Sequence, residues 1–260
     1  MLKRLPRTLL LVLTLIELNS LAAQTNYSNG DTLNVVALGG INLRKGPGSN
    51  YDVVTKANNA EQLIIKSITN YKDSIEFNGR WVEVYSLDNS KRGYAFDVFL
   101  SRFPVVNELT TIQKFKRVDA CWQGMITAAQ EYVSKAFNEG ASTKYHNGYD
   151  GEGAMSIEIV ELGQHARFIK HGGYEGGKNE LELFNARPSE AYYLIKNMIK
   201  QIKAEILESD AVIINETALM NPMNVNTFKY ECAFSCGDCT IELREKQNKT
   251  ISIFFAFYCC

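Results

Sequence analysis

The chain has 260 residues, a formal net charge of -1 at pH 7 and 45% hydrophobic residues. This length suits two modest domains, each with a core of its own. The near-neutral charge argues against a nucleic-acid-binding protein, which needs a basic face, and the hydrophobic content excludes a disordered chain.

The first residues carry the pattern of a secretory signal peptide, which we predict for residues 1–23. Basic residues precede an apolar run over residues 9–16, and the small residues Ala22 and Ala23 follow. The apolar run is too short to span a bilayer, and no cysteine follows the small residues to carry a lipid. We therefore expect a periplasmic or secreted protein, cleaved near Ala22 or Ala23, whose mature chain has no membrane span.

Residues 32–104 have the composition of a small β-barrel or sandwich. Short runs rich in Val, Ile and Tyr alternate with Gly, Asn and Asp. Gly46, Pro47 and Gly48 favour a tight reversal, because glycine adopts positive φ freely and proline presets φ. The predicted strands are residues 33–38, 41–46, 62–68, 81–86 and 93–99.

Three separated motifs in this part resemble bacterial SH3-like (SH3b) domains. INLRKGPG at residues 41–48 is similar to the family's strand and Gly-Pro turn, WVEV at 81–84 to its Trp-x-x-Val strand, and GYAFDVFL at 93–100 to its closing segment. The chain departs from the family at Tyr94, where Trp is usual, and at residues 67–80, which exceed the usual connection. The resemblance implies an SH3-like barrel over residues 32–104 that recognises peptidoglycan peptide or another extended peptide of the cell envelope.

Aromatic residues of this domain form the predicted ligand site. In the run WVEVY the two valines fall on one strand face and Trp81 on the other, so a buried valine face leaves Trp81 near the surface. With Tyr51 and Tyr94 it would form a stacking platform for an extended ligand. The alternative is that these aromatics only cover the edges of the barrel. The predicted ligand-binding residues, including two on the strand before the turn, are Asn42, Arg44, Tyr51, Trp81 and Tyr94.

After a predicted linker at residues 105–118, the hydrophobic period becomes helical over residues 122–136 and again over 187–210. Pro188 suits the first turn of the second helix, which carries an apolar stripe. A polar, glycine-bearing loop is predicted for residues 141–153, and no internal repeat is evident. Strands are predicted at residues 154–162, 166–172, 180–186, 227–234, 239–245 and 250–258. The predicted fold class is thus mainly β plus α+β: the barrel is followed, at residues 119–260, by an antiparallel sheet with two helices on one face.

In an exported chain, disulfides are the first interpretation of cysteines. The six candidates are Cys121, Cys232, Cys236, Cys239, Cys259 and Cys260. We expect the last two strands to place odd positions opposite odd ones across a loop with an odd number of residues. At least one disulfide should then link the terminal pair to the turn at Cys236–Cys239, leaving Cys121 for Cys232. Zinc is the alternative, but a second Cys-x-x-Cys pair is missing, so we predict no metal and no cofactor.

The main functional prediction is a non-catalytic binding protein, with no catalytic residues and with cell-wall peptide or an exported protein as its partner. The first alternative is a thiol-dependent cell-wall hydrolase using Cys121 and His165, which occur in a suitable order. However, DACWQGM lacks the Asp-Cys-Ser/Thr-Gly context that resemblance to such peptidases requires. The second alternative makes the C-terminal domain a structural or inhibitory partner of another exported protein.

Overall fold

The computed structural model shows a β-rich α+β protein with curled antiparallel sheets and two helices, as predicted. It describes residues 26–106, 130–137, 140, 142–149, 154–172, 176–206, 212–216, 229–234 and 237–259. The predicted signal peptide, most of the predicted linker, and Cys121, Cys236 and Cys260 lie outside the described residues. Within the described part, no helix has both the length and the apolar character needed to cross a membrane.

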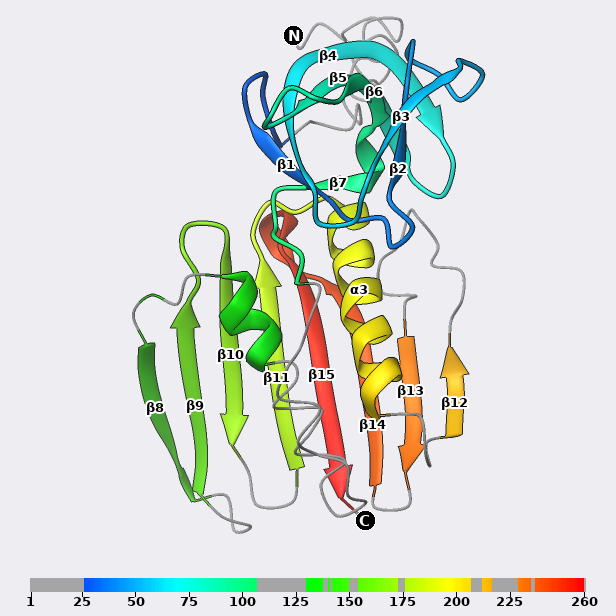
Figure 1. Ribbon diagram of the computed structural model, residues 1–260. Coiled ribbons are helices and arrows are strands. Elements are labelled where there is room, and N and C mark those ends of the chain that lie inside the picture. The colour runs from blue at the N-terminus through cyan, green and yellow to red at the C-terminus, as the bar shows by residue number, and fades with distance from the viewer. Residues whose placement is uncertain are drawn as a thin grey trace, which may run out of the picture.

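The N-terminal unit is a seven-stranded antiparallel sheet in the order β3-β2-β6-β5-β4-β1-β7. It curls around a core that includes Leu33, Leu43 and Leu63, all fully buried (Figure 1). Strand β3 follows the Gly-Pro-Gly turn and was not predicted. The elements are β1 (Thr32–Val35), β2 (Ile41–Arg44), β3 (Val53–Ala57), β4 (Gln62–Ser74), β5 (Asn78–Ser86), β6 (Arg92–Phe96), the 3₁₀ turn η1 (Asp97–Phe99) and β7 (Leu100–Ser101).

The C-terminal unit is an eight-stranded antiparallel sheet in the order β12-β13-β14-β15-β11-β10-β9-β8. Helical residues 130–136 precede its first four strands, and α3 (Pro188–Ile206) precedes the other four. The same succession of elements therefore occurs twice, and the last strands of the two halves pair at the centre of the sheet. The strands are β8 (Ser142–Tyr149), β9 (Ala154–Glu161), β10 (Ala166–Gly172), β11 (Gly176–Leu183), β12 (Val212–Glu216), β13 (Lys229–Phe234), β14 (Gly237–Glu245) and β15 (Ile251–Cys259), with the 3₁₀ turn η5 (Gln247–Lys249) before β15.

The loop predicted for residues 141–153 is wrong for most of its length, because Ser142–Tyr149 form β8. This strand lies at the edge of the sheet and pairs only with β9. An edge strand tolerates polar side chains on both faces, since water covers its free side. Strand β8 therefore lacks the apolar alternation that identified most of the other strands. Strand β12, at the opposite edge of the sheet, was not predicted either.

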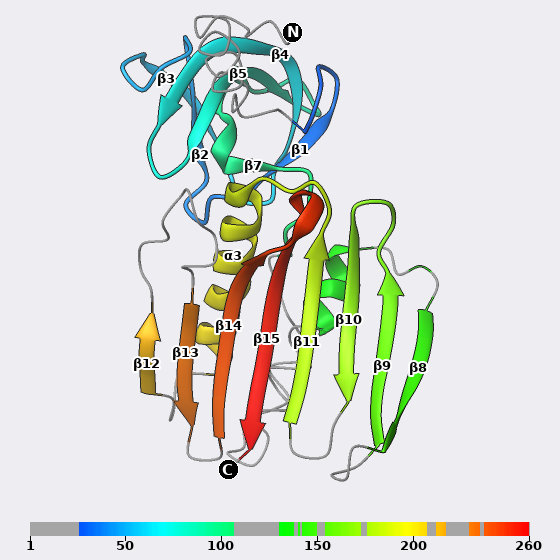
Figure 2. The ribbon, with the colours of Figure 1, turned by 180° about the vertical axis from the view of Figure 1, so that it is seen from behind.

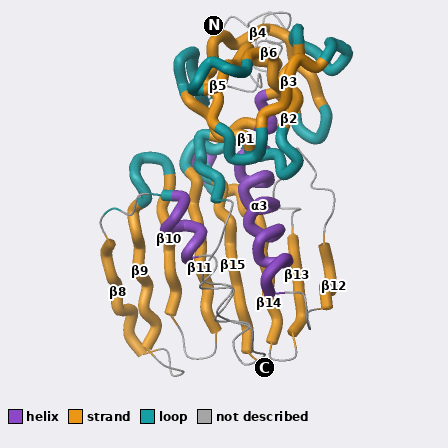
Figure 3. The backbone as a smooth tube through the Cα atoms, viewed as in Figure 1, coloured by secondary structure: helices purple, strands orange, loops and turns teal. Residues whose placement is uncertain are grey.

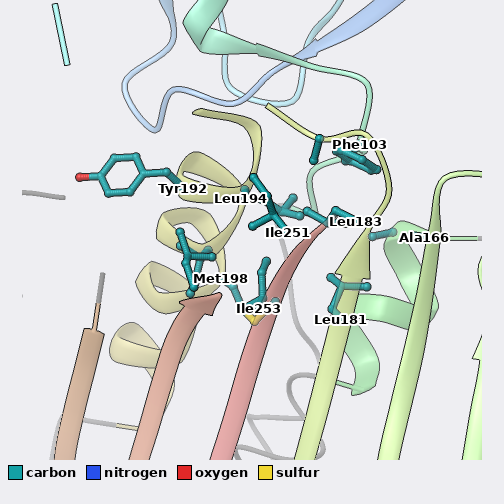
Figure 4. Close-up of a cluster of buried hydrophobic side chains, with 14 of the residues drawn as sticks. Phe103, Ala166, Leu181, Leu183, Tyr192, Leu194, Met198, Ile251 and Ile253 are labelled. Atoms are coloured by element: carbon teal, nitrogen blue, oxygen red, sulfur yellow. The ribbon is translucent and has the colours of Figure 1, made fainter. Parts of the chain in front are cut away.

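Both helices lie on one face of the C-terminal sheet, as Figures 1 and 3 show, and the other face carries no helix among the described residues (Figure 2). Helix α3 begins at Pro188, as predicted. Its buried stripe includes Leu194 and Met198, which lie over Ile251 and Ile253 of β15 (Figure 4). Burying this one face accounts for the alternation of apolar and polar residues along the central strands.

The register of the last hairpin confirms the parity that the sequence predicted. Glu245 pairs with Ile251 across an odd number of residues, and odd positions face odd ones along β14 and β15. Near the far end of the sheet, Cys259 lies opposite Gly237, and Cys239 is the partner of Cys232 in β13. The disulfide between the terminal pair and the Cys236–Cys239 turn stays a prediction.

The two units pack together through the β4–β5 hairpin. Phe77 of this hairpin is buried, with its ring centroid 5.4 Å from that of Tyr192 in α3. The Tyr193 hydroxyl of the same helix donates a hydrogen bond of 2.6 Å to Glu76. Glu76 and Phe77 of this hairpin thus attach the N-terminal unit to α3.

Candidate functional site

Four of the five predicted ligand-binding residues lie on one outer face of the N-terminal sheet. Arg44 in β2 is the partner of Tyr94 in β6, and Trp81 in β5 is the partner of Phe96. Asn42 lies two residues before Arg44 and therefore shares its face. Tyr51 follows in the loop between β2 and β3.

The prediction that Trp81 is exposed is wrong, because only 4% of this residue is accessible. Its ring centroid lies 5.6 Å from that of Phe96, and the aromatic contacts continue through Phe99 to Tyr193 of α3. The valines beside Trp81 are buried in the core of the N-terminal sheet, as predicted. Strand β5 is therefore covered on both faces at this point, by its own core and by the C-terminal unit.

Tyr94 lies at the border of the covered region, half-buried against the same aromatic residues. Beyond it, the outer face is open to solvent at Asn42 and at Lys56, which are partners in β2 and β3. The predicted aromatic platform is thus divided. One end joins the two units, and the other end remains accessible.

Tyr51 is held against the Gly-Pro-Gly turn by close contact. A Cβ atom at Gly46 would lie only 2.4 Å from the Tyr51 ring. The Arg44 guanidinium donates a hydrogen bond of 2.6 Å to the carbonyl oxygen of Tyr51, so both ends of this residue are fixed. Neither Gly46 nor Gly48 has positive φ. The prediction that these glycines are needed for positive φ is therefore wrong. Glycine is needed at position 46 because a side chain there would collide with the Tyr51 ring.

Replacing Gly46 with alanine should displace the Tyr51 ring and lower the free energy of unfolding by about 1 kcal/mol, a typical cost of inserting a methyl group into a filled space. Gly39 is the matched control, because a Cβ atom there meets nothing within 4 Å. The Gly39→Ala variant should stay within about 0.5 kcal/mol of the parent protein. Urea unfolding measures both, and equal values for the two variants would contradict the contact.

Strand β3 is an open edge of the N-terminal sheet. Among the strands that the structure describes, it pairs only with β2. Val53 and Val54 are 48% and 52% accessible, which is unusual for two adjacent β-branched residues in a strand. We call this region the β3 edge surface, and it consists of Asn42, Arg44, Tyr51, Val53, Val54 and Lys56.

A second polar cluster lies between the two units, and its groups are buried and paired. Arg187, just before α3, contacts Asp97 at 3.1 Å and Glu190 at 3.6 Å. The Tyr27 hydroxyl donates to Asp97 at 2.6 Å, and the Arg102 backbone N–H donates to Glu190 at 3.0 Å. We call these five residues the inter-unit joint. Because its charges already satisfy one another, its role is to hold the units together.

The joint shifts the pKa values of Glu190 and Arg187. Burial by itself would raise the pKa of Glu190, but the Arg187 guanidinium and the backbone N–H groups of Arg187 and Arg102 outweigh it. The pKa of Glu190 therefore lies below its usual value. Burial would likewise lower the pKa of Arg187, whereas the nearby carboxylates Glu190 and Asp97 raise it. Both groups are charged throughout the physiological pH range.

The open face of the C-terminal sheet also carries charged residues around a shallow pocket of about 570 Å³. Within it, Arg167 and Lys246 both contact Glu182, and Lys246 also contacts Glu180 at 2.5 Å. Burial acts to raise the pKa of Glu182, but Lys246 and Arg167 bring it below its usual value. Arg167 and Lys246 are thus already paired with carboxylates of the same face, so neither cation is available to a ligand.

The residues of the hydrolase alternative are not brought together by anything that the structure describes. His165 lies exposed in the turn between β9 and β10, and Cys121 is outside the described residues. Within the described ranges, no group of three His, Cys, Asp or Glu side chains is placed to hold a metal ion. The β3 edge surface is therefore the candidate site.

Comparisons with known proteins add no relationship to this geometry. No family model, no curated protein and no solved structure matches the chain.

Proposed function

We propose that the chain is an exported, non-catalytic binding protein that captures an extended peptide of the cell envelope at the β3 edge surface. In this proposal the N-terminal unit is an SH3-like barrel, and peptidoglycan peptide is the first candidate ligand. The C-terminal unit supports the barrel through the inter-unit joint.

The observation that carries the proposal is the open edge of β3. An edge strand offers unpaired backbone N–H and C=O groups to an added strand, and proteins usually protect such edges with charge, proline or a covering segment. Strand β3 carries one exposed charge, Lys56, but also exposes Val53 and Val54 beside the fixed ring of Tyr51. Apolar contacts next to free backbone groups are what an extended peptide requires.

The proposal differs from the platform expected from sequence, because Trp81 is not part of it. The ligand meets the accessible end of the outer face, where Asn42, Arg44 and Tyr51 lie. Tyr94 borders this surface through its pairing with Arg44. The buried aromatic end of the face belongs to the contact with α3.

Replacing Val53 and Val54 together with asparagine should weaken binding of the full chain to isolated cell wall about tenfold, since each valine loses part of the 1.5–3 kcal/mol that burial provides. Leu87→Asn is the matched control, because Leu87 is 55% accessible and lies in the turn between β5 and β6. A sedimentation assay on isolated wall measures both. Equal binding by the parent and the double variant would overturn the proposed site.

The same incubation tests the absence of catalysis. Chromatography of the supernatant should show no soluble wall fragments beyond those released without protein. Release of fragments would instead favour the hydrolase alternative, and a Cys121→Ala variant would then show whether the thiol is responsible.

A further inference from the structure

We infer that the peptide bound at the β3 edge surface is acidic and that its carboxylates pair with Arg44 and Lys56. This inference rests on the proposed function, because it identifies the chemistry of the ligand at the same surface. It goes beyond that function by predicting which extended peptides are selected.

Arg44 has a guanidinium that is positioned but not neutralised. One of its N–H groups donates to the carbonyl oxygen of Tyr51 at 2.6 Å, and no ion pair with a described carboxylate is formed. The residue as a whole is half-buried, and its hydrogen bond to Tyr51 is exposed, so a ligand can reach its remaining donors. A fixed guanidinium with free donors suits a carboxylate, which it can bind through two parallel hydrogen bonds.

Lys56 supplies a second positive charge on the same face. It is exposed, it is the β3 partner of Asn42, and no described carboxylate forms an ion pair with it. Lys56 lies opposite Asn42, and Asn42 is two residues from Arg44 on β2. Lys56 is therefore displaced from Arg44 by two residues, roughly 7 Å, along the strand direction.

Neighbouring cations of the N-terminal unit differ in having acidic partners. Lys66 and Arg92 share Glu83 at 3.0 and 2.7 Å, and Lys91 contacts Glu61 at 2.7 Å. The Lys45 ammonium forms an ion pair of 3.0 Å with the Asp52 carboxylate on the other side of the glycine turn. The open edge is therefore bordered by positive charge that the described part of the chain does not balance.

The spacing defines the ligand more closely. Side chains of an extended strand return to the same face every second residue. A peptide added to β3 would thus direct acidic residues at positions i and i+2 toward the face of Arg44 and Lys56. We expect peptides with alternate acidic residues to bind, and neutral peptides of the same shape to bind weakly.

Two fluorescein-labelled octapeptides test this inference on the full chain by fluorescence anisotropy. They are TVEVEVTS and TVQVQVTS, which differ only by Glu or Gln at two alternate positions. The Glu peptide should bind five- to tenfold more tightly at 50 mM salt, and the difference should shrink at 500 mM salt because added ions screen exposed charges.

Variants assign the preference to the two cations. Lys56→Gln, which removes no hydrogen bond or ion pair within the described chain, should reduce the preference for Glu about threefold, and Arg44→Gln with Lys56→Gln should abolish it. Lys72→Gln with Lys144→Gln is the matched control, because it changes net charge equally on the exposed strands β4 and β8. This control should keep the full preference.

The outcomes separate this inference from the proposed function. If both peptides bind equally and both lose affinity in the Val53→Asn, Val54→Asn variant, the acidic preference is wrong and the edge site stands. If cell wall binds through the edge but neither peptide binds at 1 mM, the inference is also wrong. If neither wall nor peptide binds, the proposed function and the inference both fail.

Discussion

Replacing Arg187 with methionine is expected to lower the free energy of unfolding by about 3–5 kcal/mol, the usual cost of removing one partner from a buried ion pair. Methionine fills much of the space but removes the nearer of the two guanidinium groups that contact Glu190, whose side chain has no accessible surface. Only the Arg102 guanidinium, at 3.8 Å, then remains. Asp97 loses the same contact, and the carbonyl oxygen of Leu100 loses its 2.6 Å hydrogen bond from Arg187. The penalty is the desolvation of the groups that remain charged.

The same variant should change the response to acid. The lowered pKa of Glu190 contributes stability that is present above the unfolded value near 4.5 and is lost as pH falls through the lower folded value. Without Arg187, burial acts to raise the pKa of Glu190, so acid unfolding should begin at a higher pH. Thermal melting between pH 7 and pH 3 measures this shift.

Lys45→Met is the control for the joint. It breaks the pair with Asp52, whose two side chains are 65% and 77% accessible, and should cost less than about 1 kcal/mol. A loss at Arg187 as small as that at Lys45 would mean that the units are not held together by the joint.

Replacing Trp81 with alanine should lower the free energy of unfolding by about 3–5 kcal/mol, as expected for truncation of a large buried aromatic residue. The indole contacts Phe96 and donates a 3.4 Å hydrogen bond to Asp73, so the variant loses both packing and a polar contact. Guanidinium unfolding of the full chain measures the loss. Tyr71→Ala is the control, since Tyr71 is 62% accessible and should change stability by less than about 0.5 kcal/mol.

This experiment also distinguishes two interpretations of the aromatic residues. At temperatures where the Trp81→Ala variant is folded, its binding to cell wall should equal that of the parent, because Trp81 lies outside the β3 edge surface. If the Trp81→Ala variant kept the stability of the parent but lost wall binding, Trp81 would belong to the ligand site after all.

Much of the strand arrangement could be predicted from sequence because each strand buries one face. The alternation in β14 and β15 was enough to predict which positions face each other across the last hairpin, and the register agrees. Strands β3, β8 and β12 escaped prediction for a physical reason. All three are edge strands, and an edge strand does not need the alternation that a central strand needs.

The environment of Trp81 could not be predicted from its own strand. Local alternation shows that Trp81 and the valines lie on opposite faces, which is correct, but not that α3 covers the second face. Trp81 joins the core cluster of the C-terminal unit through Phe96 and Phe99, and Phe99 contacts Tyr193, far along the chain. The joint was missed for a similar reason, because Asp97, Arg187 and Glu190 are ordinary surface-type residues until the two units meet.

The cover over Trp81 has a consequence for the order of events during synthesis. The hydrogen bond between Glu76 and Tyr193 spans 117 residues of sequence, whereas every strand of the N-terminal sheet has been made once Ser101 is added. At a synthesis rate of about 5–20 residues per second, the N-terminal sheet can form on the order of 5 to 20 s before α3 is complete. Throughout that interval the aromatic face of β5 and β6 is open to water and to other chains. The nascent protein is therefore most prone to aggregation after its first unit has folded, and a chaperone that shields aromatic surface would act during that interval.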